Sequence, residues 1–133
     1  MTDLQPVRGQ IYWVAIGREG EPTAAEHPAL IVQSDEGNQT RRVVIVAEVS
    51  TDRGGQLAGL PYTVPVKIHE SGLPHDSVVN TGQLHTVLKT RLLRPGGRLA
   101  AGALARVDRA LRYSLGFEAW PPPPRTNFVQ PPG

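Results

Sequence analysis

The run Val-Val-Ile-Val-Ala at residues 43–47 constrains the fold more than any other segment of the chain. β-Branched residues favour extended backbone, and a strand that lacks polar alternation is typical of one buried on both faces. We therefore predict a central strand over residues 42–49. Further runs of β-branched or aromatic residues, bounded by glycine, proline and polar residues, predict strands over residues 10–16, 28–34, 62–68, 77–80 and 83–87.

One long segment has helical rather than strand periodicity. Apolar residues recur at three and four positions over residues 101–116, and Gly116 is suited to cap the end of such a helix. The predicted apolar stripe consists of Leu104, Val107, Leu111 and Leu115. A single helical turn is predicted over residues 89–93, a break at 95–97, and turns over 35–41 and 72–76.

Short strands followed by one amphipathic helix predict a small β-barrel with a helix packed on it. Pro65 lies within a predicted strand and has no backbone N–H to donate, so that strand is expected at a sheet edge. A chain of 133 residues has room for one domain, which we place at residues 1–118. Residues 119–133 are rich in proline and are expected to form an extended, flexible tail.

Composition excludes several kinds of site. The chain has no cysteine, so disulfides, zinc thiolate sites and cysteine nucleophiles are excluded. The formal net charge is only +2, but twelve of the fourteen basic residues are arginine, which suits phosphate contacts. The sequence shows neither a secretory signal nor an apolar run long enough for a membrane span. These features predict a soluble cytoplasmic protein that has no membrane partner.

Six segments, taken in order, resemble one protein family. Residues 8–14 (RGQIYWV), 27–32 (HPALIV) and 43–51 (VVIVAEVST) are similar to the first three strands of the MazF/PemK (Kid-like) toxins of type II toxin–antitoxin systems. The later segments that match are DSVV at 76–79, QLHTV with KTRL over 83–92, and the helix over 105–116. The resemblance covers residues 8–117 and leaves out the proline-rich tail.

The resemblance carries expectations about fold, activity and partners. It implies a mainly β protein with some α structure, an SH3-like barrel of the CcdB/MazF type with a C-terminal amphipathic helix. It implies a homodimer that cleaves single-stranded RNA without a metal ion or other cofactor and leaves a 2′,3′-cyclic phosphate. It also implies a cognate antitoxin, which blocks the RNA groove with an extended peptide.

The resemblance places the catalytic residues at the ends of two strands. His27 stands where the family has an arginine, and Ser50, followed by Thr51, stands where the family has a threonine. Metal-free cleavage needs a base for the 2′-OH, donors to the phosphate and an acid for the leaving oxygen. Imidazole changes its charge near neutral pH, so His27 has the chemistry of an acid or a base. A hydroxyl at position 50 or 51 can donate to a phosphate oxygen.

Further residues are candidates for contact with RNA. Gln83 matches a glutamine in the family's groove, His85 a basic residue, and Asn38 a loop asparagine. Arg41 and Arg53 are expected to contact the RNA backbone from flanking loops. A metal site is not predicted, because the spacing of His69 and His75 fits no usual ligand pattern.

Two other functions remain open at this point. Replacement of the family's arginine and threonine by His27 and Ser50 is compatible with a weak or inactive barrel that binds nucleic acid or protein. The related CcdB fold acts on DNA gyrase, which leaves a gyrase-directed toxin as the other alternative.

Overall fold

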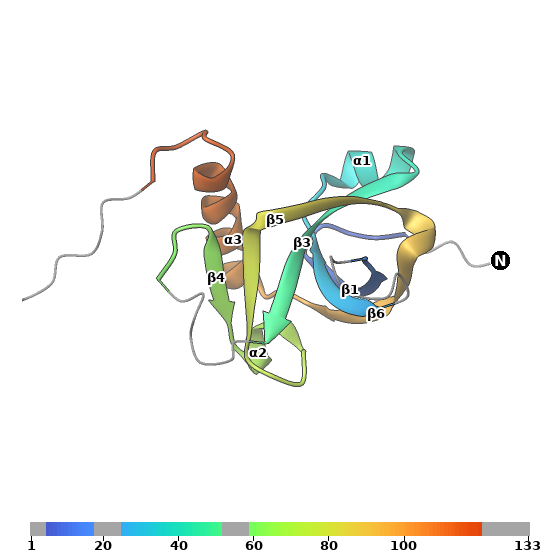
Figure 1. The fold of residues 1–133 in the computed structure, drawn as a ribbon, viewed down its shortest axis with the longest axis horizontal. Helices are drawn as coiled ribbons and strands as arrows, with labels where there is room; N and C mark the ends of the chain where they lie inside the picture. The colour runs from blue at the N-terminus through green and yellow to red at the C-terminus, as the bar shows by residue number, and fades with distance from the viewer. Residues whose placement is uncertain (1–4, 18–24, 52–58, 121–133) are drawn as a thin grey trace, which may run out of the picture.

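The computed structural model describes residues 5–17, 25–51 and 59–120, which form one curled antiparallel sheet and its covering helices (Figure 1). The strand order is β4-β5-β3-β2-β1-β6. The elements are β1 Gln10–Ala15, β2 Glu26–Ile31, α1 Asp35–Thr40, β3 Val43–Thr51, β4 Thr63–Val66, α2 Ile68–Ser71, β5 Ser77–Leu88, the 3-10 turn η1 Lys89–Arg91, β6 Leu92–Arg98 and α3 Ala101–Ser114. The mainly β barrel with a C-terminal helix is confirmed.

The sheet buries both of its faces, because successive side chains of a strand point to opposite sides. Strand β3 shows this directly: Val44 and Val46 face one apolar cluster, while Ala47 and Val49 face another. The first cluster is the barrel interior and the second lies under α3. The barrel-interior cluster consists of Tyr12, Val14, Ile16, Ala29, Ile31, Val44, Val46 and Leu92. The prediction of a strand buried on both faces is confirmed.

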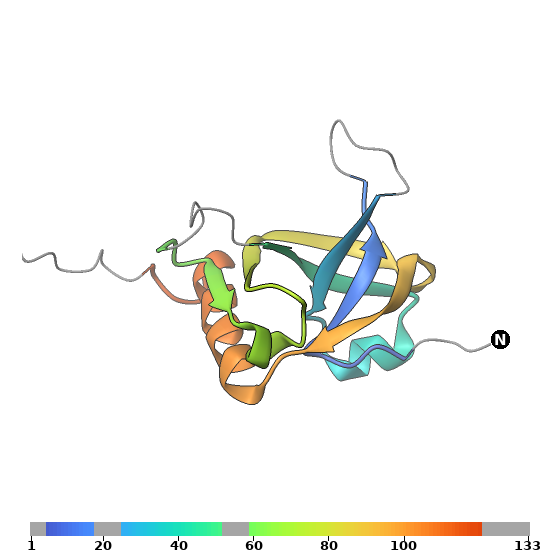
Figure 2. The same ribbon diagram turned by 90° about the horizontal axis from the view of Figure 1, so that it is seen from below.

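Helix α3 packs on β4 and β5, at the side of the molecule away from α1 (Figure 2). Its buried residues are Ala103, Val107 and Ala110, with Leu104 and Leu111 partly buried beside them. The predicted stripe is therefore wrong at its end, because Leu115 is 55% exposed as the C-terminal cap. Gly116 follows Leu115 with a φ of 82°, which confirms that this glycine ends the helix.

Two segments differ from the predicted secondary structure. Residues 35–40 form helix α1 rather than a turn, because the Ser34 hydroxyl accepts the Gly37 N–H at 3.2 Å and caps the helix. Residues 95–97 do not end regular structure, since they belong to β6, which pairs with β1 through two register shifts. Those shifts let an edge strand accommodate Pro95, which has no N–H for the ladder.

Strand β5 is continuous where two short strands were predicted. Its pairing with β3 shifts between Ala47, opposite Leu84, and Glu48, opposite Asn80, so residues 81–83 bulge out of the ladder. The Thr81 hydroxyl fixes this bulge by donating to the Tyr62 carbonyl at 2.6 Å. The predicted edge position of Pro65 is confirmed, because β4 is the outermost strand beside β5. The turn predicted over 89–93 is the 3-10 turn η1.

Arg8 joins the start of the barrel to two helices. Its backbone N–H donates to Asp35 Oδ1 at 2.8 Å, which lowers the pKa of that carboxyl. Its guanidinium lies 2.7 Å from Asp108 Oδ1 on α3. Arg8, the first residue of the segment that resembles the family, therefore connects α1 and α3 to the start of β1. Within the described part of the chain, no helix is long and apolar enough to cross a membrane.

Candidate active site at the polar end of the barrel

The inward-facing rows of β2 and β3 change from apolar to polar at one end of the barrel. On β2 the row runs from Ile31 and Ala29 to His27, and on β3 it runs from Val46 to Glu48 and Ser50, by alternation along each strand. Together these rows place an imidazole, a carboxylate and a hydroxyl on one concave face.

His27 and Ser50 lie just beyond the last paired residues of β2 and β3. The ladder ends with Ala29 opposite Glu48, and alternation puts His27 and Ser50, each two residues further on, on the same face. On its other side His27 pairs with Val14 of β1. Thr51 is exposed and, by alternation, points to the opposite face from Ser50. Of the two predicted hydroxyls, the structure thus brings Ser50 onto the same face as His27.

Glu48 and His85 form a close pair on this face. His85 lies opposite Val46, and its Nε2 is 2.8 Å from Glu48 Oε2. The Glu48 side chain is only 14% exposed, whereas that of His85 is 29% exposed, so the imidazole is open to solvent and its carboxylate partner is shielded. Sequence reasoning missed Glu48. The available signal was that it is the only charged residue in the otherwise apolar strand over 43–51.

The bulge of β5 takes Gln83 away from the position opposite Glu48. Without it, the register of Ala47 with Leu84 would continue and place Gln83 opposite Glu48. Instead, Asn80 occupies that position, and its side chain accepts the Gly82 N–H at 2.9 Å. Gln83 is exposed on the bulge, two residues before His85, where it remains a candidate for contact with RNA.

Other predicted RNA contacts lie elsewhere. Asn38 is fully buried in α1, where its amide donates to the Gln33 carbonyl at 3.1 Å and accepts from the Gln33 side chain at 3.1 Å. A direct contact between Asn38 and RNA is therefore wrong for this structure. Arg41 follows α1, at the end of the β2–β3 pair opposite His27, and donates to Gln33 Oε1 at 3.3 Å. Arg53 and the tail over 121–133 lie outside the described residues.

On the outer face of the same strands, the carboxylate of Glu26 is paired with an arginine. Glu26, next to His27, lies 2.9 Å from Arg94, whose guanidinium sits 5.2 Å from the centre of the Trp13 ring. A bare carboxylate near a phosphate path would repel RNA, but this one is paired with a cation. Trp13 is half-buried beneath Arg94.

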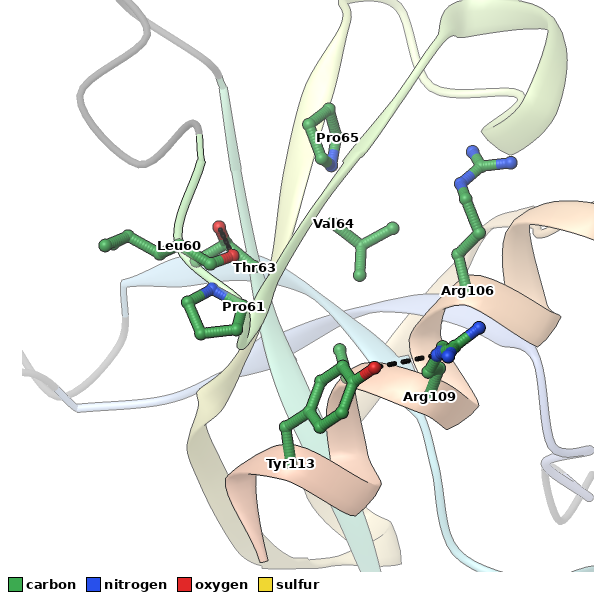
Figure 3. Close-up of a pocket in the computed structure, with 9 residues that line it drawn as sticks. Leu60, Pro61, Thr63, Val64, Pro65, Arg106, Arg109 and Tyr113 are labelled. Atoms are coloured by element: carbon green, nitrogen blue, oxygen red, sulfur yellow. Dashed lines mark hydrogen bonds between the residues drawn. The ribbon is translucent and has the colours of Figure 1, made fainter. Parts of the chain in front are cut away.

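A separate pocket of about 290 Å³ opens between β4 and α3 (Figure 3). Its lining is mainly apolar, and its two cations are already engaged. Arg106 lies 2.7 Å from Glu70, and Arg109 donates to the Tyr113 hydroxyl at 2.8 Å, which raises the pKa of Arg109. This pocket holds no acid–base pair comparable with Glu48 and His85. Among the described residues, no group of three or more His, Asp and Glu side chains could hold a metal ion.

Comparison with known proteins gives a consistent result. The family model described as PemK-like, MazF-like toxin of type II toxin–antitoxin systems matches residues 7–115. The endoribonuclease MazF6 of Mycobacterium tuberculosis is 37% identical over 109 residues, which cover 81% of this chain and 95% of that protein. The endoribonuclease MazF of Staphylococcus epidermidis is 34% identical over 111 residues, covering 83% and 91%.

The fold has a matching solved structure. An endoribonuclease from a mycobacterial species, solved in complex with its cognate antitoxin, aligns with a TM-score of 0.70 at 25% identity. The alignment covers 87% of this chain and 99% of the solved one. The likeness therefore extends over nearly all of that protein.

Proposed function

The chain belongs to the PemK-like, MazF-like toxin family of type II toxin–antitoxin systems, and we propose that it is a toxin that cleaves single-stranded RNA. The observation that supports this proposal is the polar inward face that His27, Ser50 and His85 share by strand alternation, with Glu48 against His85. The relatives are named endoribonucleases, which favours RNA cleavage over the gyrase-directed alternative.

The groups on this face can carry out cleavage without a metal ion. A base removes the 2′-OH proton, the 2′-oxygen attacks phosphorus, and an acid protonates the departing 5′-oxygen, which leaves a 2′,3′-cyclic phosphate. The imidazole of His27 has the chemistry of an acid or a base, and the Ser50 hydroxyl can donate to a non-bridging oxygen. His85, held by Glu48, adds a second imidazole to the same face. We expect Gln83, which is exposed on the β5 bulge, to contact the flanking RNA.

Partners follow from the family. A mycobacterial relative was solved with its cognate antitoxin, and we propose that an antitoxin blocks this chain by covering the same face with an extended segment. We also propose that the protein acts as a homodimer in the cytoplasm, where its RNA substrates are found. Size-exclusion chromatography with light scattering tests the dimer directly, and a monomer at micromolar concentration would contradict it.

The test of activity uses the purified protein and a mixed-sequence, end-labelled RNA in EDTA. We expect fragments that end in 2′,3′-cyclic phosphate, and a loss of about 100-fold or more in rate for His27→Ala. Ser50→Ala should be slower than wild type, while Ser50→Thr, which keeps the hydroxyl, should retain activity. His69→Ala is the matched control, since His69 is exposed on α2.

Three outcomes would contradict the proposal. Undiminished cleavage by His27→Ala would remove His27 from the mechanism. Tight binding of RNA by the wild-type protein without cleavage would make the barrel a binding module. Cleavage that disappears in EDTA and returns on addition of Mg²⁺ would refute a metal-free reaction.

A further inference from the structure

We propose that the aromatic pair of Tyr62 and Trp120, beside the bulge of β5, stacks a base of the single-stranded RNA that flanks the cleaved bond. This inference rests on the proposed RNA cleavage and adds a base-binding subsite to it. Trp120 lies beyond residues 7–115, which the family model matches, so the subsite depends on a residue outside the family pattern.

The two rings form a fixed platform with an exposed surface. Their centroids are 5.6 Å apart and their planes are tilted by 40°, within the range typical of aromatic pairs. The indole Nε1 of Trp120 donates to the Tyr113 carbonyl at 3.1 Å, near the end of α3, yet Trp120 is 57% exposed. Because the one polar atom of the indole is already bonded, the ring presents apolar π surface to solvent.

The bulge of β5 holds the other ring in place. The Tyr62 carbonyl accepts the Thr81 N–H at 2.8 Å and the Thr81 hydroxyl at 2.6 Å. A Cβ added to Gly82 would lie only 2.9 Å from Cδ2 of the Tyr62 ring, so the missing side chain lets this ring lie against the backbone of the bulge. The platform is therefore anchored on β5 through Tyr62 and on α3 through Trp120.

Amide groups lie beside the platform. The Asn80 side chain accepts the Gly82 N–H through Oδ1, and the described part of the chain offers its Nδ2 no acceptor. Gln83 is exposed on the same bulge. Proteins that read single-stranded RNA stack unpaired bases on aromatic rings and bond the base edges with polar side chains. An aromatic plane with two amides near it therefore suits a base better than it suits an apolar peptide.

Strand β5 connects the platform to the candidate active site. Asn80 pairs with Thr63 of β4 on one side and with Glu48 of β3 on the other. Since each neighbour is one strand spacing away, the backbone of Tyr62, next to Thr63, lies roughly 10 Å from that of Glu48. The platform is thus beside the site rather than within it, and a base stacked there belongs to a flanking nucleotide.

A titration with uncleavable RNA tests the stacking directly. Mixed-sequence RNA with 2′-O-methyl riboses lacks the nucleophilic hydroxyl, so its binding can be measured without cleavage. In the Trp13→Phe background Trp120 is the only tryptophan, and we expect the RNA to quench its fluorescence. Stacking energies per base predict that Trp120→Ala binds fluorescently labelled RNA about 5- to 150-fold more weakly.

Two further variants serve as controls for this titration. Trp120→Phe keeps a ring at the position and should recover most of the affinity. Phe117→Ala removes another aromatic ring, 80% exposed just after α3, and should bind the RNA as wild type does. Together they separate stacking at position 120 from a general loss of exposed apolar surface.

Cleavage kinetics give a second readout. Trp120 touches no reacting atom in this scheme, so Trp120→Ala should raise KM by a similar factor and leave kcat within about twofold of wild type. Shortening the RNA stepwise from each end should remove the difference between the two proteins once the stacked nucleotide is lost. A fall in kcat with an unchanged KM would contradict a binding subsite.

The titration also separates this inference from the proposed function. Equal affinity of wild type and Trp120→Ala for the uncleavable RNA would overturn the stacking, as would Trp120 fluorescence that saturating RNA does not quench. A changed mass of Trp120→Ala in light scattering, with unchanged RNA affinity, would assign this surface to contact between copies of the chain. Wild-type protein that binds RNA with quenching but cleaves none would refute the proposed cleavage and leave the stacking subsite standing.

Discussion

Replacing Gly82 with alanine tests how far the bulge of β5 supports the strand that carries His85. An added Cβ would lie 2.9 Å from Cδ2 of the Tyr62 ring and 3.2 Å from Oδ1 of Asn80, both too close for ordinary contact. Gly82 is not among the glycines with positive φ, so its backbone suits any residue and only space requires glycine. The substitution is therefore a steric probe of the bulge.

The neighbours of the added methyl group resist displacement. The Tyr62 ring packs against Trp120 with 5.6 Å between ring centroids, and the Tyr62 carbonyl holds Thr81 at 2.6 Å. Asn80 Oδ1 is held by the Gly82 N–H. Overpacking of this kind costs about 1–3 kcal/mol. For a domain of this size, each kcal/mol lowers the melting temperature by about 4 °C, so we expect a decrease of about 4–12 °C.

The assay combines thermal unfolding with RNA cleavage well below the melting temperature. Gly82→Ala should melt earlier and also cleave more slowly while fully folded, because His85 lies three residues along the displaced strand. Gly102→Ala is the matched control: nothing lies within 4 Å of its added Cβ, and it sits in α3, where alanine favours the helix. We expect it to raise stability by up to about 1 kcal/mol. Wild-type stability and rate in Gly82→Ala would refute the reasoning.

Three further predictions concern stability. Leu30→Ala, at a fully buried position, should lower the free energy of unfolding by about 2–5 kcal/mol in urea titrations, whereas Leu115→Ala, which is 55% exposed at the helix end, should change it far less. Asn38→Ala removes the partner of the Gln33 carbonyl and of a Gln33 side-chain N–H. It should lower the free energy of unfolding by about 1–3 kcal/mol, with no change in the cleavage rate of the folded protein. The backbone N–H of Ile68 and then the Lys67 ammonium hold the pKa of Asp76 below its usual value, so Asp76 stabilises the fold above about pH 4 and loses this effect as the pH falls further. Asp76→Asn should thus be less stable than wild type at pH 7, and the two melting temperatures should converge in acid.

The sequence predicted those elements whose cause is local. The β-branched run over 43–47 indicated β3, Pro65 indicated an edge, and Gly116 indicated the end of α3, because each depends on the chemistry of neighbouring residues. Helix α1 escaped prediction because Gly37 and Asn38 have low helix propensity, which the Ser34 cap and the burial of Asn38 overcome.

The remaining elements depend on contacts between distant parts of the chain. β6 contains a proline and two glycines and is a strand only because β1 pairs with it. Gly97 is needed there because a Cβ would come 2.2 Å from the Ser71 carbonyl oxygen, a neighbour that no local pattern reveals. The face of α3 that is buried also depends on its neighbours, since a close approach to the sheet selects Ala103 and Ala110 over Leu115.

Part of the site could be predicted from the sequence, and the part that depends on contacts between distant strands could not. Resemblance located His27, Ser50, Gln83 and His85, and the register of the sheet is consistent with the placement of His27 beside Ser50. Glu48 could not be found this way, because its contact with His85 spans 37 residues and depends on the pairing register of β3 with β5. A partner that is fixed by the register between two strands leaves no periodic signal in either strand.

The replacement of arginine by histidine gives Glu48 its significance. Arginine keeps its charge at every physiological pH and binds phosphate with a planar fork, so a site built on it needs no group to control protonation. Imidazole binds phosphate as a cation only when protonated, and accepts a proton only when neutral. A site built on histidines therefore depends on the form that each ring has. The shielded carboxylate of Glu48 faces Nε2 of His85, where it favours a hydrogen on that nitrogen and offsets the charge of the ring when the ring is protonated, which is why a negative charge beside a phosphate path is compatible with cleavage at this site.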